Sequence, residues 1–158
     1  MSEAAQQSPF SEDQQRALRC VLDQIIPPSA DAKMPGAGEI GLVAYIEQAL
    51  QKTPDLGPMI AEGLAAADGL AAGRGAQDFA SLPEAQRSQV LEELSTTHPG
   101  FLPTLTFHTY VGYYQQPRIA AALGMEAHPP YPKGFPMEAG DLSLLDEVKK
   151  RPKMFREV

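Results

Sequence analysis

The stretch FLPTLTFHTYVGYY, residues 101–114, decides between an all-helical fold and a mixed one. Its β-branched and aromatic residues favour a strand by local propensity. One helical face is nevertheless available, because four residues recur at helical spacing: Leu102, Leu105, Thr109 and Gly112. We therefore predict a helix over residues 101–114, and with it a fold built from helices.

Apolar residues recur at helical spacing on both sides of this stretch as well. Near the N-terminus, Ser11 is followed by two acids and Gln14, which together offer an N-cap, an acidic first turn and a Ser-x-x-Gln capping box. Prolines and glycines separate the apolar segments and mark the turns. The predicted helices cover residues 11–26, 40–50, 59–70, 83–94, 101–114, 117–124 and 143–148. We expect an all-α protein, a compact bundle of about five to seven short helices.

The domain organisation follows from length and from the distribution of proline. A chain of 158 residues has the size of one domain, so we expect one core. Residues 1–10 are predicted to form a flexible polar tail, and residues 11–124 the helical domain. Residues 125–158 are predicted to form an extended arm rich in proline and aromatic residues, followed by a short C-terminal helix.

The charge distribution restricts the classes of partner. The chain carries 13 basic and 20 acidic residues, a net charge of -7. Such a chain repels nucleic acid and anionic lipid headgroups, so we expect neither as a partner. The last ten residues are different, because they hold five basic residues and one acid, a net +4: Lys149, Lys150, Arg151, Lys153 and Arg156. We interpret this end as either a solvated tail or a clasp on an acidic partner surface.

Sequence motifs for catalysis are absent. The chain has no Walker loop, no G-x-G-x-x-G, no H-E-x-x-H and no G-x-S-x-G, and its single Cys20 excludes an internal disulfide. The three histidines, His98, His108 and His128, are spaced so that no two share a helix face. We predict no catalytic, cofactor-binding or metal-binding residue in this chain. His108 is expected to be a hydrogen-bonded ring at the edge of the core.

Targeting signals are absent too. The N-terminal residues carry no signal peptide or twin arginine, and no apolar run is long enough to insert into a membrane. We therefore expect a cytoplasmic protein as the sequence is written. A periplasmic location stays open if a signal was removed.

Aromatic residues concentrate in the second half of the chain, beside the proline-rich arm. Tyrosine is favoured in protein interfaces, and a proline-stiffened segment loses little entropy when it docks. We predict a partner interface that includes Tyr110, Tyr113, Tyr114, Pro129, Pro130, Tyr131 and Phe135. The alternative is that the arm wraps around its own domain.

Seven stretches, taken in their order and spacing, resemble the gluconate 2-dehydrogenase subunit 3 family. They are LRCVLDQIIPPS (18–29), MPGAGEIGLVAYIEQAL (34–50), GLAAADGLA (63–71), LPEAQRSQVLEEL (82–94), FHTYVGYYQQP (107–117), LGMEAHPPYPKGFPM (123–137) and LLDEVKKRPKMFR (144–156). The resemblance covers most of the chain, and no single stretch has the specificity of a metal motif.

The resemblance implies a small accessory subunit, not the seat of catalysis, that binds and stabilises or matures a larger enzyme. That partner is expected to be a large GMC-type dehydrogenase subunit that carries FAD and oxidises a sugar or polyol. A cytochrome c is a further candidate subunit of the same complex. Some members carry a twin-arginine signal for export, which this sequence lacks.

The sequence is compatible with two other functions. One is a small cofactor-free isomerase or lyase acting on a sugar, with His108 and a nearby tyrosine as acid and base. The other is a helical module that binds a quinone or haem in an apolar cavity lined by Met, Tyr and Phe residues.

Overall fold

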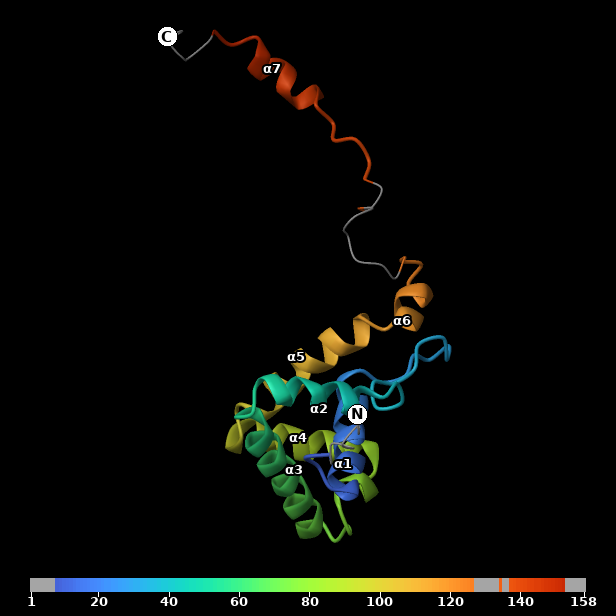
Figure 1. The fold of residues 1–158 in the computed structure, drawn as a ribbon, viewed down its shortest axis with the longest axis vertical. Coiled ribbons are helices and arrows are strands. Elements are labelled where there is room, and N and C mark those ends of the chain that lie inside the picture. The colour runs from blue at the N-terminus through green and yellow to red at the C-terminus, as the bar shows by residue number, and fades with distance from the viewer. Residues whose placement is uncertain (1–7, 127–133, 135–136, 153–158) are drawn as a thin grey trace, which may run out of the picture. The chain divides into compact units, whose positions relative to one another are not determined.

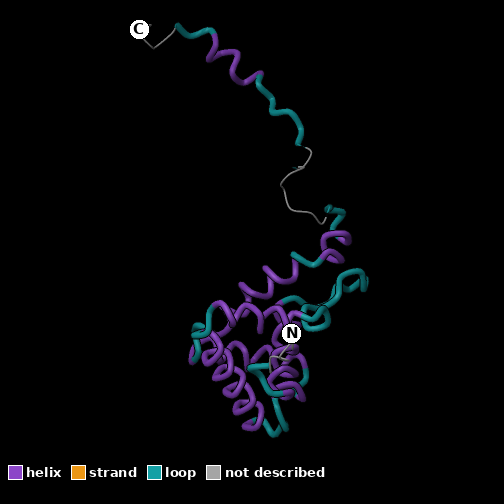
Figure 2. Tube along the Cα trace, in the orientation of Figure 1, coloured by secondary structure: helices purple, strands orange, loops and turns teal. Residues whose placement is uncertain are grey.

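The computed structural model describes residues 8–126, 134 and 137–152, and all regular structure in these ranges is helical (Figure 2). The α-helices are α1 Glu12–Ile25, α2 Leu42–Lys52, α3 Leu56–Gly73, α4 Glu84–Thr97, α5 Phe101–Tyr114, α6 Pro117–Ala122 and α7 Asp146–Lys149. Two short 3-10 helices are η1 Phe79–Ser81 and η2 Ser143–Leu145. The predicted all-α bundle is confirmed, and residues 101–114 are a helix.

The chain divides into two units, Met1–Ala127 and His128–Val158. The first unit holds α1 to α6 and η1, and the second holds η2 and α7. No helix within residues 8–126 or 137–152 is both long and apolar enough to cross a lipid bilayer.

Helix α1 begins where the sequence predicts. The Ser11 side chain accepts a hydrogen bond from the Gln14 amide at 3.2 Å, and the Gln14 side chain accepts one from the Ser11 amide at 2.9 Å. This reciprocal pair satisfies two of the amide groups that a helix N-terminus otherwise leaves unpaired. Leu18, Val21 and Leu22 then point into the core from one face of the helix.

Helix α5 is central to the bundle. It packs against α1, α2, α3, α4 and α6 (Figure 1, yellow to gold). Its buried residues recur at helical spacing: Phe101, Leu105, Thr109, Gly112 and Tyr113. The Thr109 hydroxyl donates to the Leu105 carbonyl at 2.6 Å, so this buried polar group is satisfied within the helix. Burial of one face by the neighbouring helices outweighs the local preference for a strand.

Two glycines let the neighbouring helices approach α5 closely. A Cβ added at Gly63 of α3 would lie 2.1 Å from the Phe101 ring. A Cβ added at Gly112 of α5 would lie 2.6 Å from the Tyr45 ring of α2. These distances are far below van der Waals contact, so the two crossings depend on the missing side chains.

Three hydrogen bonds connect the loop between α1 and α2 to the helices beside it. The Ala37 amide donates to the Ile26 carbonyl at 2.9 Å, and the Gly38 amide donates to Asp23 Oδ1 at 2.8 Å. The Tyr113 hydroxyl of α5 donates to the Pro35 carbonyl at 2.8 Å. The loop therefore connects the end of α1 to the C-terminal part of α5.

Candidate partner interface

The predicted interface residues fall into three groups. Tyr110 and Tyr114 lie on α5 with their rings partly exposed, 46% and 49% respectively. Tyr113 is fully buried, with its hydroxyl bonded to Pro35. The others, Pro129, Pro130, Tyr131 and Phe135, lie outside the described residues. The interface stays a prediction, and the exposed rings of Tyr110 and Tyr114 are the ones free to make such a contact.

Tyr113 differs from its neighbours because of the direction in which α5 presents it. Burial, followed by the neighbouring Tyr114, raises the pKa of the Tyr113 phenol above its ordinary value. The Tyr113 and Tyr114 rings meet edge to face, with their centroids 5.3 Å apart. Tyr113 is thus part of the core, whereas Tyr114, one position along the helix, is turned outward.

Sequence reasoning missed a third member of the exposed surface, Phe107. Its side chain is 64% exposed, more than either tyrosine. Phe107, Tyr110 and Tyr114 are separated by three and four positions, so they lie on one side of the helix. We call these three residues the α5 aromatic face. The sequence contained a signal for this face, because residues at positions i, i+3 and i+7 of a helix lie on the same side.

The rings of the α5 aromatic face are partly preorganised. Tyr110 and Tyr114 stack with centroids 5.9 Å apart and planes inclined by 28°. Phe107 meets the His108 ring edge to face, at 5.3 Å and 81°. Rings that already pack against neighbours lose little side-chain entropy when a partner covers them.

The exposed apolar surface continues in sequence beyond α5. Helix α6 packs against α5, and Leu123 and Met125 directly follow α6. Both side chains are about half exposed or more, at 49% and 59%. Leu123 and Met125 thus add exposed apolar side chains directly after the helix that packs on α5.

His108 was the residue considered for acid–base catalysis, and its surroundings are aromatic. Its ring lies 6.4 Å from the Tyr45 ring, centroid to centroid, and beside Phe107. Its Nδ1 atom is buried and has no hydrogen-bond partner among the described residues. The predicted hydrogen bond to the ring is therefore missing at this nitrogen. An acid–base pair would place the His108 ring and a tyrosine hydroxyl within hydrogen-bonding reach, and no hydrogen bond between His108 and Tyr45 forms in this part of the chain.

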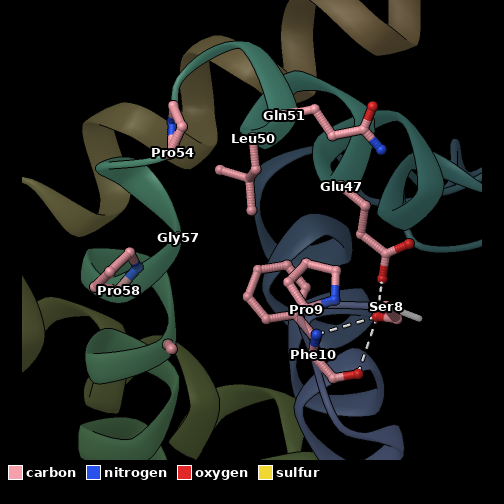
Figure 3. Close-up of a pocket in the computed structure, with 10 residues that line it drawn as sticks. Ser8, Pro9, Phe10, Glu47, Leu50, Gln51, Pro54, Gly57 and Pro58 are labelled. Carbon is pink, nitrogen blue, oxygen red and sulfur yellow. Dashed lines mark hydrogen bonds between the residues drawn. The ribbon is translucent and has the colours of Figure 1, made fainter. Parts of the chain in front are cut away.

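A separate open cavity of about 610 Å³ lies beside residues 8–10, α2 and α3 (Figure 3). Pro9, Phe10 and Leu50 form an apolar wall, and Pro54 and Pro58 lie across from them. The Ser8 hydroxyl bonds to the Glu47 carboxylate, and Ser8 Oγ also accepts from the Phe10 amide at 3.1 Å. These bonds hold the chain where it enters α1. No histidine, cysteine or basic side chain lines the cavity, so its described walls offer no acid–base pair.

Metal-ligating side chains are dispersed in the described ranges. Within residues 8–126, 134 and 137–152, no three His, Cys, Asp or Glu side chains gather closely enough to hold a metal ion.

Fold and surface together define an all-helical domain with an exposed aromatic face on its central helix. The family model of gluconate 2-dehydrogenase subunit 3 matches residues 12–129, about three quarters of the chain. The chain belongs to the gluconate 2-dehydrogenase subunit 3 family, and the suspected resemblance is confirmed. No curated protein and no solved structure is significantly similar to it.

Proposed function

We propose that this chain is the non-catalytic small subunit of a dehydrogenase complex. It binds the FAD-containing catalytic subunit of a bacterial sugar or polyol dehydrogenase, and it stabilises or matures that subunit. The family supports a subunit role in a dehydrogenase. The observation that carries the proposal is the α5 aromatic face, Phe107, Tyr110 and Tyr114, exposed on the central helix of the bundle.

The physical argument concerns the cost of leaving such a face in water. Burial of apolar surface is worth roughly 25 cal/mol per Å², and aromatic side chains present some of the largest areas. Tyrosine also keeps a hydroxyl for hydrogen bonding at a desolvated interface. A partner that covers three adjacent rings therefore gains affinity from a small area of this chain.

The division of labour in the complex follows from the same proposal. The large GMC-type subunit holds the FAD and performs the oxidation, while this chain binds no cofactor of its own. A cytochrome c in the same complex would accept the electrons. The net charge of -7 fits a protein partner better than a nucleic acid.

The test is co-expression of the chain with a flavoprotein dehydrogenase encoded beside it. The soluble yield of the flavoprotein, its flavin content and its sugar-dependent reduction of a dye are measured with and without the chain. An unrelated helical protein of similar size, expressed from the same vector, serves as the control. We expect this chain, and not the control protein, to raise the yield, the flavin content or the activity of the flavoprotein. A flavoprotein that is fully active without the chain and never binds it would refute the proposal.

A second variant separates the subunit role from an enzymatic one. His108→Ala removes the only ring that was considered for acid–base catalysis, together with a buried nitrogen that has no hydrogen-bond partner among the described residues. We expect the complex with His108→Ala to keep its full sugar-dependent activity. Loss of activity with an intact, flavin-loaded complex would instead place chemistry in this chain.

A further inference from the structure

The second unit carries an apolar face of its own. Every described residue from 137 to 152 is exposed, including four large apolar side chains of the C-terminal helical segment: Leu142, Leu144, Leu145 and Val148. Leu145 and Val148 are three positions apart, and Leu144 and Val148 four, so they share one helical face. A helical face of leucines without a core beneath it is a surface that a partner can bury.

Local interactions shape this segment before any partner binds. The Asp141 side chain accepts from the Ser143 amide at 2.9 Å, which supports the start of η2. Lys149 pairs with Asp146 at 3.0 Å and Lys150 with Glu147 at 2.6 Å, each across one helical turn. Exposed pairs of this kind stabilise a helix only weakly, and an isolated helix this short is marginal in water. The segment is therefore biased towards a helix whose full stability requires a binding partner.

Charge indicates what kind of surface the partner offers. Residues 149–158 hold five basic residues and one acid, a net +4, whereas residues 1–148 hold 8 basic and 19 acidic residues, a net -11. A run with this charge is attracted to carboxylates, so the surface that it fits on a partner is acidic.

We propose that residues 142–151 form a docking segment that binds the catalytic subunit in an apolar groove bordered by carboxylates. This inference rests on the proposed function and adds a second contact to the α5 aromatic face. The leucines and Val148 fill the groove, and the basic residues after Val148 pair with its acidic border.

The experiment measures the affinity of the full-length chain for the purified flavoprotein subunit. The apolar variant is Leu144→Ser/Leu145→Ser/Val148→Ser, and the charge variant is Lys149→Ala/Lys150→Ala/Arg151→Ala. The control is Met137→Ser, which removes an 89% exposed apolar side chain from the same unit outside its helices. We expect the apolar variant to weaken binding about tenfold or more and the control to leave it within about twofold. The charge variant should flatten the salt dependence of the affinity.

The outcomes separate this inference from the proposed function. If the wild-type chain binds and both variants bind as tightly, the docking segment is refuted and the subunit role stands. If the wild-type chain does not bind the flavoprotein at all, both the docking segment and the subunit role are refuted. Two further results would overturn the inference alone. One is a lower melting temperature of the free chain in the apolar variant, which would mean that the segment packs on its own domain. The other is wild-type binding to phosphatidylserine vesicles that the same substitutions abolish.

Discussion

Leucine has opposite roles in the two units of this chain. In the first unit, Leu18, Leu22 and Leu105 are completely buried between helices, whereas Leu144 in the second is 80% exposed. The residue type and the helical spacing are the same, so neither explains the difference. What differs is the number of neighbouring helices, since α1 and α5 each pack against several others. Leucine at helical spacing therefore forms a core only where neighbouring helices cover it, as they do in the first unit.

The largest expected effect comes from shortening one leucine in each unit. Leu105→Ala removes buried methyl groups between packed helices and should cost about 2–5 kcal/mol of unfolding free energy. Leu144→Ala removes exposed atoms and should change the unfolding free energy by less than about 0.5 kcal/mol. Urea unfolding monitored by circular dichroism measures both. Equal destabilisation would mean that the second unit has a core contact of its own.

A pair of glycines within α3 tests how tightly the first unit is packed. Gly63→Ala places a methyl group against the Phe101 ring and should destabilise by about 1–3 kcal/mol. Gly69→Ala lies on the same helix with no neighbouring atom within 4 Å of the added Cβ. Because alanine has a higher helix propensity than glycine, Gly69→Ala should raise the free energy of unfolding by up to about 1 kcal/mol. The sign of the change in melting temperature should thus differ between the two variants, and a shared sign would contradict this packing.

The adjacent residues Tyr113 and Tyr114 of α5 should differ less strongly in their effect on stability. Tyr113→Phe removes the hydroxyl that donates to the Pro35 carbonyl and should cost about 1 kcal/mol. Tyr114→Phe removes an exposed hydroxyl and should leave stability unchanged. Amide hydrogen exchange in the loop of residues 27–41 should accelerate in the first variant only. Unchanged exchange in Tyr113→Phe would show that the loop is held by its other bonds.

The smallest expected effect is a dependence on pH that has opposite signs at two aspartates. Burial raises the pKa of Asp23 above 3.8, so the folded state binds this proton more readily than the unfolded chain does. Asp23→Asn should therefore have a higher free energy of unfolding than the wild type near neutral pH. The difference should shrink as the pH falls through the raised pKa towards 3.8. The Asn side chain keeps an oxygen for the Gly38 amide.

The matched control for Asp23 is Asp31. Hydrogen bonding to Ser29 and Lys33 lowers the pKa of Asp31. Its contribution to stability is present above 3.8 and is lost as the pH falls through the lowered pKa. Asp31→Asn should therefore be less stable than the wild type near neutral pH, with a difference that fades in acid. Urea unfolding at several pH values compares the two variants, and a common sign would contradict the assignment.

Local signals in the sequence were sufficient for most of the fold. The Ser11 and Gln14 capping box formed as predicted because it depends only on residues within one helical turn. Helix α5 was predictable from the spacing of Leu105, Thr109 and Gly112, although its β-branched residues favour a strand. Helical period is the more reliable signal because it reports what the surrounding helices bury.

The candidate site was less predictable, for a physical reason. Tyr110, Tyr113 and Tyr114 look alike in sequence, and only the rotation of α5 within the bundle buries the second of them. That rotation follows from the packing of Phe101, Leu105 and Gly112 against other helices, and the buried Tyr113 hydroxyl meets the Pro35 carbonyl, 78 residues away in sequence. Phe107 was not predicted, although its spacing places it on the same helical face as Tyr110 and Tyr114. The contributions of Pro129, Pro130, Tyr131 and Phe135 stay predictions.

The affinity of the chain for its flavoprotein partner tests the central claim most directly. Tyr110→Ser/Tyr114→Ser removes two exposed rings from the α5 aromatic face. The control, Gln86→Ser/Gln89→Ser, changes two exposed polar residues of α4. The account predicts at least about tenfold weaker binding for the tyrosine pair, unchanged binding for the control, and an unchanged melting temperature for both free chains. Equal affinity for the tyrosine variant and the wild type would contradict the claim that the α5 aromatic face binds the partner.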